Sequence, residues 1–462
     1  MRNHLPILLL LLLCVAFASF MDALDSSIVN IILPVLAEEF HIDAGSTAWV
    51  TLTYLLTVAG LILIFGKLAD SARLKKIFLF GFLIFIIGSA GCGFAPSFAF
   101  LLGSRVIQGI GAAMIIACAP LICVKFLPEN MLGLSFAVLT AAGSVGFAAG
   151  PAVGGLITEL ISWHWVFLLN IPVGLAAFLF ASKIIPDVPK TSAPPFDLKG
   201  AVLIFIAVIF GIFTIERLPH MGLNLVICET AVLAVFSLTL FVLHELKTEN
   251  PLINLRVFTI PQVVCVYLAF FLVQFCIAGM LYLLPFYMNA GLSFAPLATG
   301  LFMFITPVFA GLVGIPCGKL SDKHGRRWFV VGAGVLFLIQ AVVYLTINPE
   351  YGLIPLAVCM ALWGLAIGMS GGAGGSRIVD WMPESEKGLG STLMITCQYF
   401  GSVLGTALFA GVFTTLTRGE TVVPFEYLST DVFLTGFHGT MLLLLFGALI
   451  IVILSVVVKD RQ

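Results

Sequence analysis

Charged residues are scarce in this chain. Lys, Arg, Asp and Glu together make up 10% of its 462 residues, whereas 61% are hydrophobic. Average soluble domains carry about a quarter charged residues, so the composition excludes an ordinary soluble domain. Apolar runs of roughly 20 residues, enough to cross the hydrocarbon of a bilayer as a helix, recur along the whole length. The sequence therefore predicts an all-α integral membrane protein.

Other absences exclude further classes of protein. The net charge is −1, and no basic tail or basic face is present to bind nucleic acid. The ten cysteines are scattered singly without a C-x-x-C pair, so neither a disulfide framework nor a metal site is indicated. The sequence also lacks a P-loop and an H-E-x-x-H motif, and its histidines are isolated. We expect no enzyme activity, no cofactor and no metal.

Charge clusters and Pro/Gly breaks divide the apolar pattern into membrane helices. The fourteen predicted spans are 5–37, 45–66, 76–95, 98–124, 130–159, 164–186, 198–216, 222–244, 259–289, 294–317, 328–347, 352–376, 387–416 and 434–458.

The distribution of positive charge predicts the orientation. If the N-terminus is cytoplasmic, every Lys and Arg except Arg105, Arg217 and Arg418 falls in a cytoplasmic segment. Cytoplasmic loops carry the excess of Lys and Arg in membrane proteins. We therefore expect a multi-pass protein of the cell membrane with both termini in the cytoplasm.

The chain repeats itself. GKLADSARLKKIFLFG from Gly66 is echoed by GKLSDKHGRRWFVVG from Gly318, and FLPENMLGLSFAV from Phe126 by WMPESEKGLGSTLM from Trp381. Such repeats predict two six-helix bundles in parallel orientation, joined by an inserted helix pair. The predicted domains are an N-terminal bundle (1–191), a two-helix linker (192–256) and a C-terminal bundle (257–462). Two matched bundles are the physical form of alternating access, but they do not by themselves prove transport.

Two carboxyl groups lie within the first span, in FMDALDSSIVNIILP. Asp22 and Asp25 are three residues apart, which places them close to one face of a helix. A carboxylate at that depth costs several kcal/mol unless it is paired, hydrated or protonated. The pair could hold a proton, hold a cation or exchange one for the other. Alternatively, one aspartate only hydrogen-bonds the helix or neighbours such as Asn30.

Arg105, in RVIQGIGAA, is the remaining strongly polar charge within a span. Its expected partners are backbone carbonyls or the first-helix aspartates, whose charged form it would favour. The alternative is a purely structural arginine that joins the first and fourth helices.

Two further motifs suggest moving parts. GSVGFAAGPAVGG spaces small residues four apart and includes Gly150 and Pro151, a pattern that permits close helix contact and a bend. GKLSDKHGRR places Asp322 and Arg326 in a short basic turn. An aspartate there could hold a cytoplasmic gate by pairing with cations and a helix N-terminus, whereas simple charge anchoring explains only the basic residues.

These motifs resemble the major facilitator superfamily, in particular its fourteen-helix drug:proton antiporter family. LDSSIVNIILP is similar to the first-helix signature, with Asp25 at the acidic position. RVIQGIGAA resembles the fourth-helix motif, GFAAGPAVGG the fifth-helix antiporter motif and WHWVFLLNIPVG the entry to the sixth helix. The resemblance implies that Arg105 takes part in proton coupling and that the protein is an exporter.

The loop motif of that family, G-x-x-x-D-R-x-G-R-[KR], is incomplete after the second helix. GKLADSARLKK keeps the aspartate as Asp70 but has Ser71 and Leu74 at two of the basic positions. Arg73 is the candidate to supply the missing charge. The second copy, Gly318–Arg327, matches better.

The sequence thus favours a monomeric, proton-coupled exporter of small hydrophobic or cationic compounds. Asp25 and Asp22 would exchange the substrate cation for a proton. Polar or aromatic residues at a suitable depth are the candidates to line the substrate site: Asn30, Gln108, Gln274, Tyr282 and Phe286. One alternative is an exporter of a metabolite such as an amino acid, siderophore or lipid. A non-transporting membrane receptor is less favoured, because the sequence contains no long polar segment to bind a partner.

Overall fold

The described part of the chain is helical. The computed structural model describes residues 5–69, 74–186, 197–248, 251, 255–381, 387–417 and 429–458. No strand occurs within these ranges. In a bilayer the backbone must satisfy its own hydrogen bonds, and helices do so within one segment. The predicted all-α membrane class is confirmed.

The helices follow the predicted order. In the described residues they are α1 (Leu5–Glu39), α2 (Ala44–Leu68), α3 (Leu74–Gly93), α4 (Phe98–Phe126), α5 (Glu129–Leu160), α6 (His164–Leu168), α7 (Asn170–Ile184), α8 (Leu198–Met221), α9 (Leu225–Glu245), α10 (Pro261–Phe286), α11 (Pro296–Met303), α12 (Ile305–His324), α13 (Arg327–Tyr344), α14 (Ile354–Trp381), α15 (Lys387–Thr417) and α16 (Thr430–Val457). Short 3-10 turns occur at Leu255–Thr259 and Pro349–Tyr351, and a π-helical turn at Tyr287–Gly291.

Thirteen helical segments of the described chain are long and apolar enough to cross a membrane. The twelfth predicted span coincides with α14, within which Ile354–Ser370 is an apolar helical stretch that is not among these thirteen. The count of fourteen therefore stays a prediction.

Two predicted spans are each built from two helices. The span predicted at 164–186 consists of α6 and α7, which meet at Leu169. The span predicted at 294–317 consists of α11 and α12, which meet at Phe304. The apolar pattern locates a span but does not reveal such local breaks.

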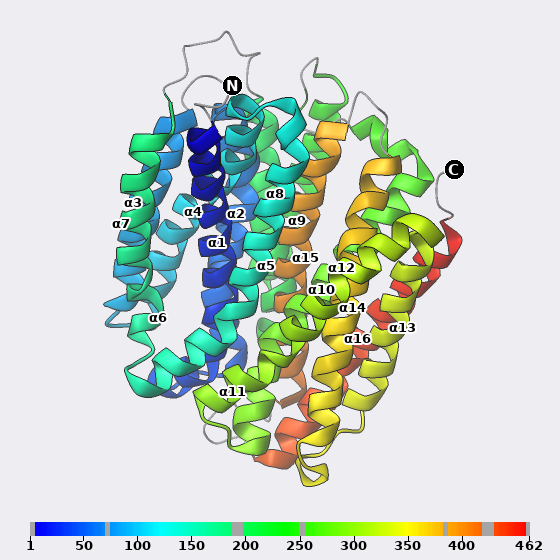
Figure 1. Ribbon diagram of the computed structural model, residues 1–462. Helices are drawn as coiled ribbons and strands as arrows, with labels where there is room; N and C mark the ends of the chain where they lie inside the picture. Colours follow the sequence, from blue (N-terminus) through cyan, green and yellow to red (C-terminus); the bar gives the residue numbers. More distant parts are fainter. Residues whose placement is uncertain are drawn as a thin grey trace. The chain divides into compact units, whose positions relative to one another are not determined.

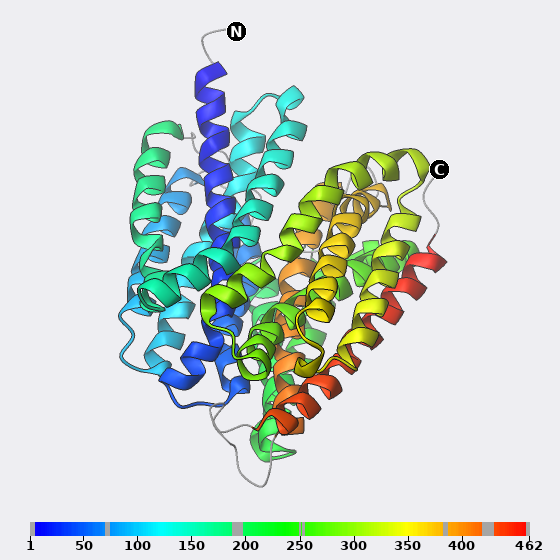
Figure 2. The same ribbon diagram turned by 60° about the horizontal axis from the view of Figure 1, so that its bottom comes forward.

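The chain divides into two compact units. The first unit contains residues 1–32, 49–209 and 236–252, and within it α3 packs against α4 and α7 (Figure 1). The second unit contains residues 33–48, 210–235 and 253–462. In the second unit α10 packs against α15 and α12 against α14, while α13 and α16 lie side by side (Figure 2). The predicted boundaries of two repeats and an inserted helix pair remain an expectation.

Glycine permits the close contact of α3 and α4. A Cβ atom added at Gly88 would lie 2.4 Å from the backbone nitrogen of Gln108. That distance is far below van der Waals contact, so only glycine fits here without a shift of backbone. The contact brings Ser89 and Gln108 within hydrogen-bond distance of each other, with 2.9 Å between Gln108 Nε2 and Ser89 Oγ.

Candidate functional site

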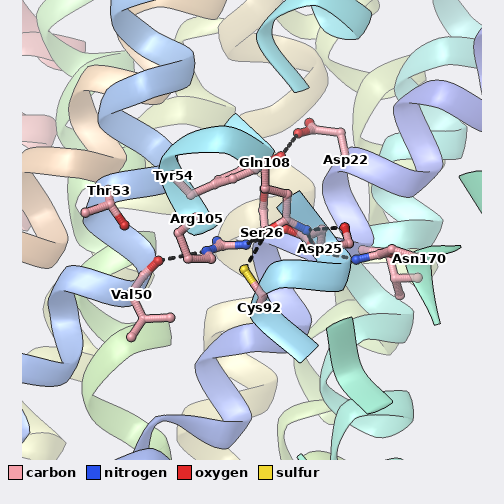
Figure 3. Close-up of polar contacts among 12 residues, drawn as sticks. Asp22, Asp25, Ser26, Val50, Thr53, Tyr54, Cys92, Arg105, Gln108 and Asn170 are labelled. Atoms are coloured by element: carbon pink, nitrogen blue, oxygen red, sulfur yellow. Dashed lines mark hydrogen bonds and ion pairs between the residues drawn. The ribbon is translucent and has the colours of Figure 1, made fainter. Parts of the chain in front are cut away.

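Three helices of the first unit bring charged and polar side chains to one buried point. Asp25 comes from α1, Arg105 and Gln108 from α4, and Asn170 from the first position of α7. We call these four residues the ion-pair cluster; Figure 3 shows them converging between the helices. Both Asp25 and Arg105 are 0% exposed. The predicted contact between the first-helix acid and the fourth-helix arginine is therefore present.

Asp25 is saturated with donors. Arg105 Nη1 donates to its Oδ2 over 2.8 Å, and its Oδ1 accepts from Gln108 Nε2 at 2.9 Å and Asn170 Nδ2 at 2.7 Å. A buried carboxylate is tolerated only when it is paired and its lone pairs are satisfied. Asp25 is paired with Arg105, and both of its carboxylate oxygens accept hydrogen bonds.

Arg105 is also held by groups other than Asp25. Its Nε donates to the carbonyl oxygen of Val50 at 2.9 Å, and its Nη1 donates to Gln108 Oε1 at 2.5 Å. Its Cζ atom lies 4.3 Å from the centre of the Tyr54 ring and 5.8 Å from that of Phe167. A guanidinium within about 6 Å of an aromatic face is attracted to it. The arginine thus joins α1, α2 and α4.

Asp22 is the carboxyl group outside the cluster. It lies on α1 one turn before Asp25 and is half-buried. Its Oδ1 accepts a hydrogen bond from the hydroxyl of Tyr54, with 2.7 Å between the oxygens (Figure 3). The two aspartates therefore have different surroundings: Asp25 is sealed in a charge-balanced cluster, whereas Asp22 is more accessible and bound by a neutral donor.

The glycine-rich stretch of α5 packs directly on α1. A Cβ atom added at Gly150 would lie 1.9 Å from Ser27 Oγ and 2.8 Å from the backbone nitrogen of Ile28. One added at Gly146 would lie 2.3 Å from the carbonyl oxygen of Phe20. These contacts flank the segment that carries both aspartates. Close packing, which the small-residue spacing predicted, is present; the gating role of Gly150 and Pro151 is a separate expectation.

The remaining predicted lining residues are not members of the ion-pair cluster. Asn30 is buried and its Nδ2 donates to the carbonyl oxygen of Ser26, 2.9 Å away on its own helix. Tyr282 and Phe286 are 0% exposed, with ring centres 5.5 Å apart. The hydroxyl of Tyr282 donates to the carbonyl oxygen of Ala44 within the second unit.

Gln274 lines a cavity of about 80 Å³ in the second unit, formed by α10, α13, α14 and α16. Most of its lining is apolar; besides the Gln274 carboxamide, Ser370 and Ser455 supply hydroxyl groups. This volume suffices for a few water molecules but not for a drug-sized compound.

The predicted gating residues are only partly described. Asp70 and Arg73 fall in segment 70–73, outside the described residues. Asp322 belongs to α12, but its side chain is not among those described. Arg326 directly precedes α13.

Sequence reasoning missed three contributors to the site: Tyr54, Ser89 and Asn170. Asn170 stands in WHWVFLLNIPVG, where a carboxamide within an apolar helix was an available signal. Within the described residues no group of three or more His, Cys, Asp or Glu side chains could hold a metal ion.

This chain is similar to known membrane transporters. The chain is 29% identical over 412 residues to the riboflavin transporter RibZ of Clostridioides difficile, which covers 88% of each chain. It is 25% identical over 403 residues to the multidrug efflux pump LfrA of Mycolicibacterium smegmatis, covering 87% of this chain and 80% of LfrA.

Among solved structures, a bacterial homologue of the human lysosomal transporter Spinster superposes with a TM-score of 0.70 at 16% identity, over 97% of each chain. At that identity the likeness concerns the fold alone. The family model described as Major Facilitator Superfamily matches residues 15–406 and 266–461. These matches extend over nearly all of the sequence, and the predicted superfamily is confirmed: the chain belongs to the Major Facilitator Superfamily.

Proposed function

We propose that this protein is a proton-coupled antiporter that exports small hydrophobic, cationic compounds across the cell membrane. The observation that carries the proposal is the fully buried Asp25–Arg105 pair at 2.8 Å, with a second, more accessible carboxyl group on the same helix. Ionisable residues in membrane spans are costly and mark ion or substrate pathways. The similarity to the efflux pump LfrA supports export of such compounds.

Charge balance assigns different roles to the two aspartates. Arg105 already neutralises Asp25, and Asp22 is the carboxyl group outside that pair. One carboxylate can be neutralised by a proton or by a substrate cation, and binding of either disfavours binding of the other. In this proposal Asp22 exchanges proton for cation, whereas Asp25 and Arg105 stay paired while α1, α2, α4 and α7 move together.

The proposed transport cycle is alternating access between the two predicted six-helix bundles. The close packing of α5 on α1 at Gly146 and Gly150 would make these helices move as one body. Pro151, which lies within α5, would supply the bend. We further propose that the protein acts as a monomer with both termini in the cytoplasm.

Reconstituted vesicles test the proposal. Under an imposed pH gradient, wild-type protein should accumulate the lipophilic cation tetraphenylphosphonium against its concentration gradient. Asp25→Asn leaves Arg105 with an unbalanced buried charge and should abolish coupling to the gradient. An Asp25→Asn protein that still couples fully would refute the proposed role of the pair.

A second candidate function is export of a metabolite. The similarity to the riboflavin transporter RibZ, at 29% identity over 88% of the chain, specifically favours it. Riboflavin carries no cationic group, so its transport would not require cation exchange at Asp22. Two results in the same vesicles would favour this function over drug export. Riboflavin enters the vesicles and tetraphenylphosphonium does not inhibit its entry, and the cation itself does not accumulate.

A further inference from the structure

Tyr54 connects the two aspartates. It is 0% exposed, its hydroxyl donates to Asp22, and its ring lies under the guanidinium of Arg105. In Figure 3 the Tyr54 side chain extends from α2 toward Asp22 on one side and Arg105 on the other. A single side chain therefore contacts both the accessible carboxyl group and the buried ion pair.

The backbone of α2 holds Tyr54 firmly in this place. The carbonyl of Val50, one helical turn earlier, accepts the Arg105 Nε–H at 2.9 Å. A Cβ atom added at Gly109 of α4 would lie 3.1 Å from the Tyr54 carbonyl oxygen and 2.8 Å from the Cβ of Thr57. Because α2 and α4 are in such close contact, Tyr54 and Arg105 cannot separate without a shift of one helix.

The chemistry of the hydroxyl makes this contact sensitive to the charge of Asp22. An O–H that donates to a carboxylate forms a charge-assisted bond, roughly twice as strong as one to a neutral acceptor. When the acceptor is an anion, it polarises the phenol ring and strengthens the attraction of the ring for a cation. Protonation of Asp22 weakens both effects at once.

We propose that Tyr54 is a positioning residue that communicates the occupancy of Asp22 to the Arg105–Asp25 pair. This inference rests on the proposed antiport function and deepens it. With Asp22 ionised, Tyr54 is held by the hydrogen bond and Arg105 is held by the ring. With Asp22 protonated, the Tyr54 hydroxyl loses its charged acceptor, and the attraction between the ring and Arg105 weakens.

Besides Asp22 and Tyr54, the titratable and charged groups of the described site come from three helices. Asp25 lies on the same helix as Asp22, Arg105 on α4 and Cys92 on α3, where its Sγ lies 3.8 Å from Gln108 Oε1. The helix α5 packs against α1, but its segment 141–158 contains no Asp, Glu, Lys, Arg, His or Tyr.

Infrared titration of the purified, reconstituted protein tests the inference without knowledge of the substrate. The protonated carboxyl band that disappears in Asp22→Asn identifies Asp22. Tyr54→Phe keeps the ring over Arg105 but removes the donor that stabilises ionised Asp22. We expect the pH midpoint of this band to rise by about one unit, a tenfold gain in proton affinity.

The matched control is Tyr344→Phe, which removes the hydroxyl of another tyrosine that is 0% exposed and lies on α13 of the second unit. This control should leave the midpoint unchanged. An unchanged midpoint in Tyr54→Phe, or the absence of any band lost in Asp22→Asn, would overturn the inference.

A different result would refute the proposed function. If wild-type protein does not couple tetraphenylphosphonium to a pH gradient, antiport is wrong regardless of the infrared midpoints. If Tyr54→Phe proves too unstable to titrate, the melting temperatures of Asp22→Asn with and without Tyr54→Phe give a second readout. The inference predicts that Tyr54→Phe lowers the melting temperature clearly less in the Asp22→Asn protein than in the wild type. An equal decrease in melting temperature in both proteins would contradict the inference.

Discussion

Removing one charge of the Asp25–Arg105 pair should destabilise the protein far more than removing both charges. Asp25→Asn leaves Arg105 fully buried. Its remaining partners are the Val50 carbonyl, Gln108 Oε1 and the rings of Tyr54 and Phe167. None of these carries a compensating negative charge. Leaving one partner of a buried pair unpaired costs about 3–5 kcal/mol. With an unfolding entropy of about 2.1 cal/mol/K per residue, each kcal/mol lowers the melting temperature of this 462-residue chain by roughly 1 °C. A loss of about 3–5 °C is therefore expected.

The double variant Asp25→Asn/Arg105→Gln removes both charges and keeps groups able to hydrogen-bond Gln108 and Asn170. Replacing a whole buried ion pair is often close to neutral. We therefore expect the double variant to be more stable than Asp25→Asn alone, with a coupling free energy of at least about 2 kcal/mol, within the range for residues of one network.

This coupling free energy is measured by thermal melting, in detergent, of the wild type, the two single variants and the double variant. As a control, Asp25→Asn is combined with Arg217→Gln, whose arginine belongs to the second unit; these two effects should add to within about 0.5 kcal/mol. If the Asp25 and Arg105 effects also simply add, the two residues do not stabilise each other, and the argument from the buried pair is refuted.

Two further predictions concern packing and the inserted helix pair. Gly150→Ala should lower the melting temperature by roughly 1–3 °C, because overpacking costs about 1–3 kcal/mol. Gly143→Ala on the same helix should be tolerated, because the nearest atom to its added Cβ lies 3.9 Å away. Equal effects of the two substitutions would contradict the close contact. Burial of Asp197 opposes its ionisation, but hydrogen bonds from the Gly200 N–H and the His244 ring outweigh this and hold the pKa of Asp197 below its ordinary value. Its stabilisation should be fully present above the unfolded pKa of about 3.9 and disappear as the pH falls through the folded value, so Asp197→Asn should destabilise the protein at pH 7 and have less effect near pH 3. A cost of Asp197→Asn that does not vary with pH would refute this assignment.

The sequence predicted both charged members of the ion-pair cluster but only one neutral member, Gln108, which was proposed as a substrate-lining residue. Asp25 and Arg105 were identifiable because an ionisable group in an apolar helix is costly and needs a partner. Neutral polar residues carry a weaker signal, as the two asparagines show. Asn30 was proposed as a lining residue but bonds its own helix at Ser26, whereas Asn170 was not proposed and donates to Asp25.

The cause of this difference is that an amide in a helix can satisfy itself on the preceding turn. Which amide does so depends on the rotation of each helix and on how closely its neighbours approach. Periodicity along one helix does not contain that information. Tyr54 was missed for the same reason: a tyrosine in an apolar span is commonly a packing residue, and only the register of α2 against α1 and α4 shows both of its contacts.

The most direct test of the central claim is proton release when a cation binds. Purified protein in weakly buffered solution, at a pH where Asp22 is protonated, is mixed with tetraphenylphosphonium and the released protons are counted with a pH indicator. We predict that wild-type protein releases a proton for each cation bound, and that Asp22→Asn releases none. Binding without proton release in the wild type, or undiminished release in Asp22→Asn, would contradict exchange of proton for cation at Asp22.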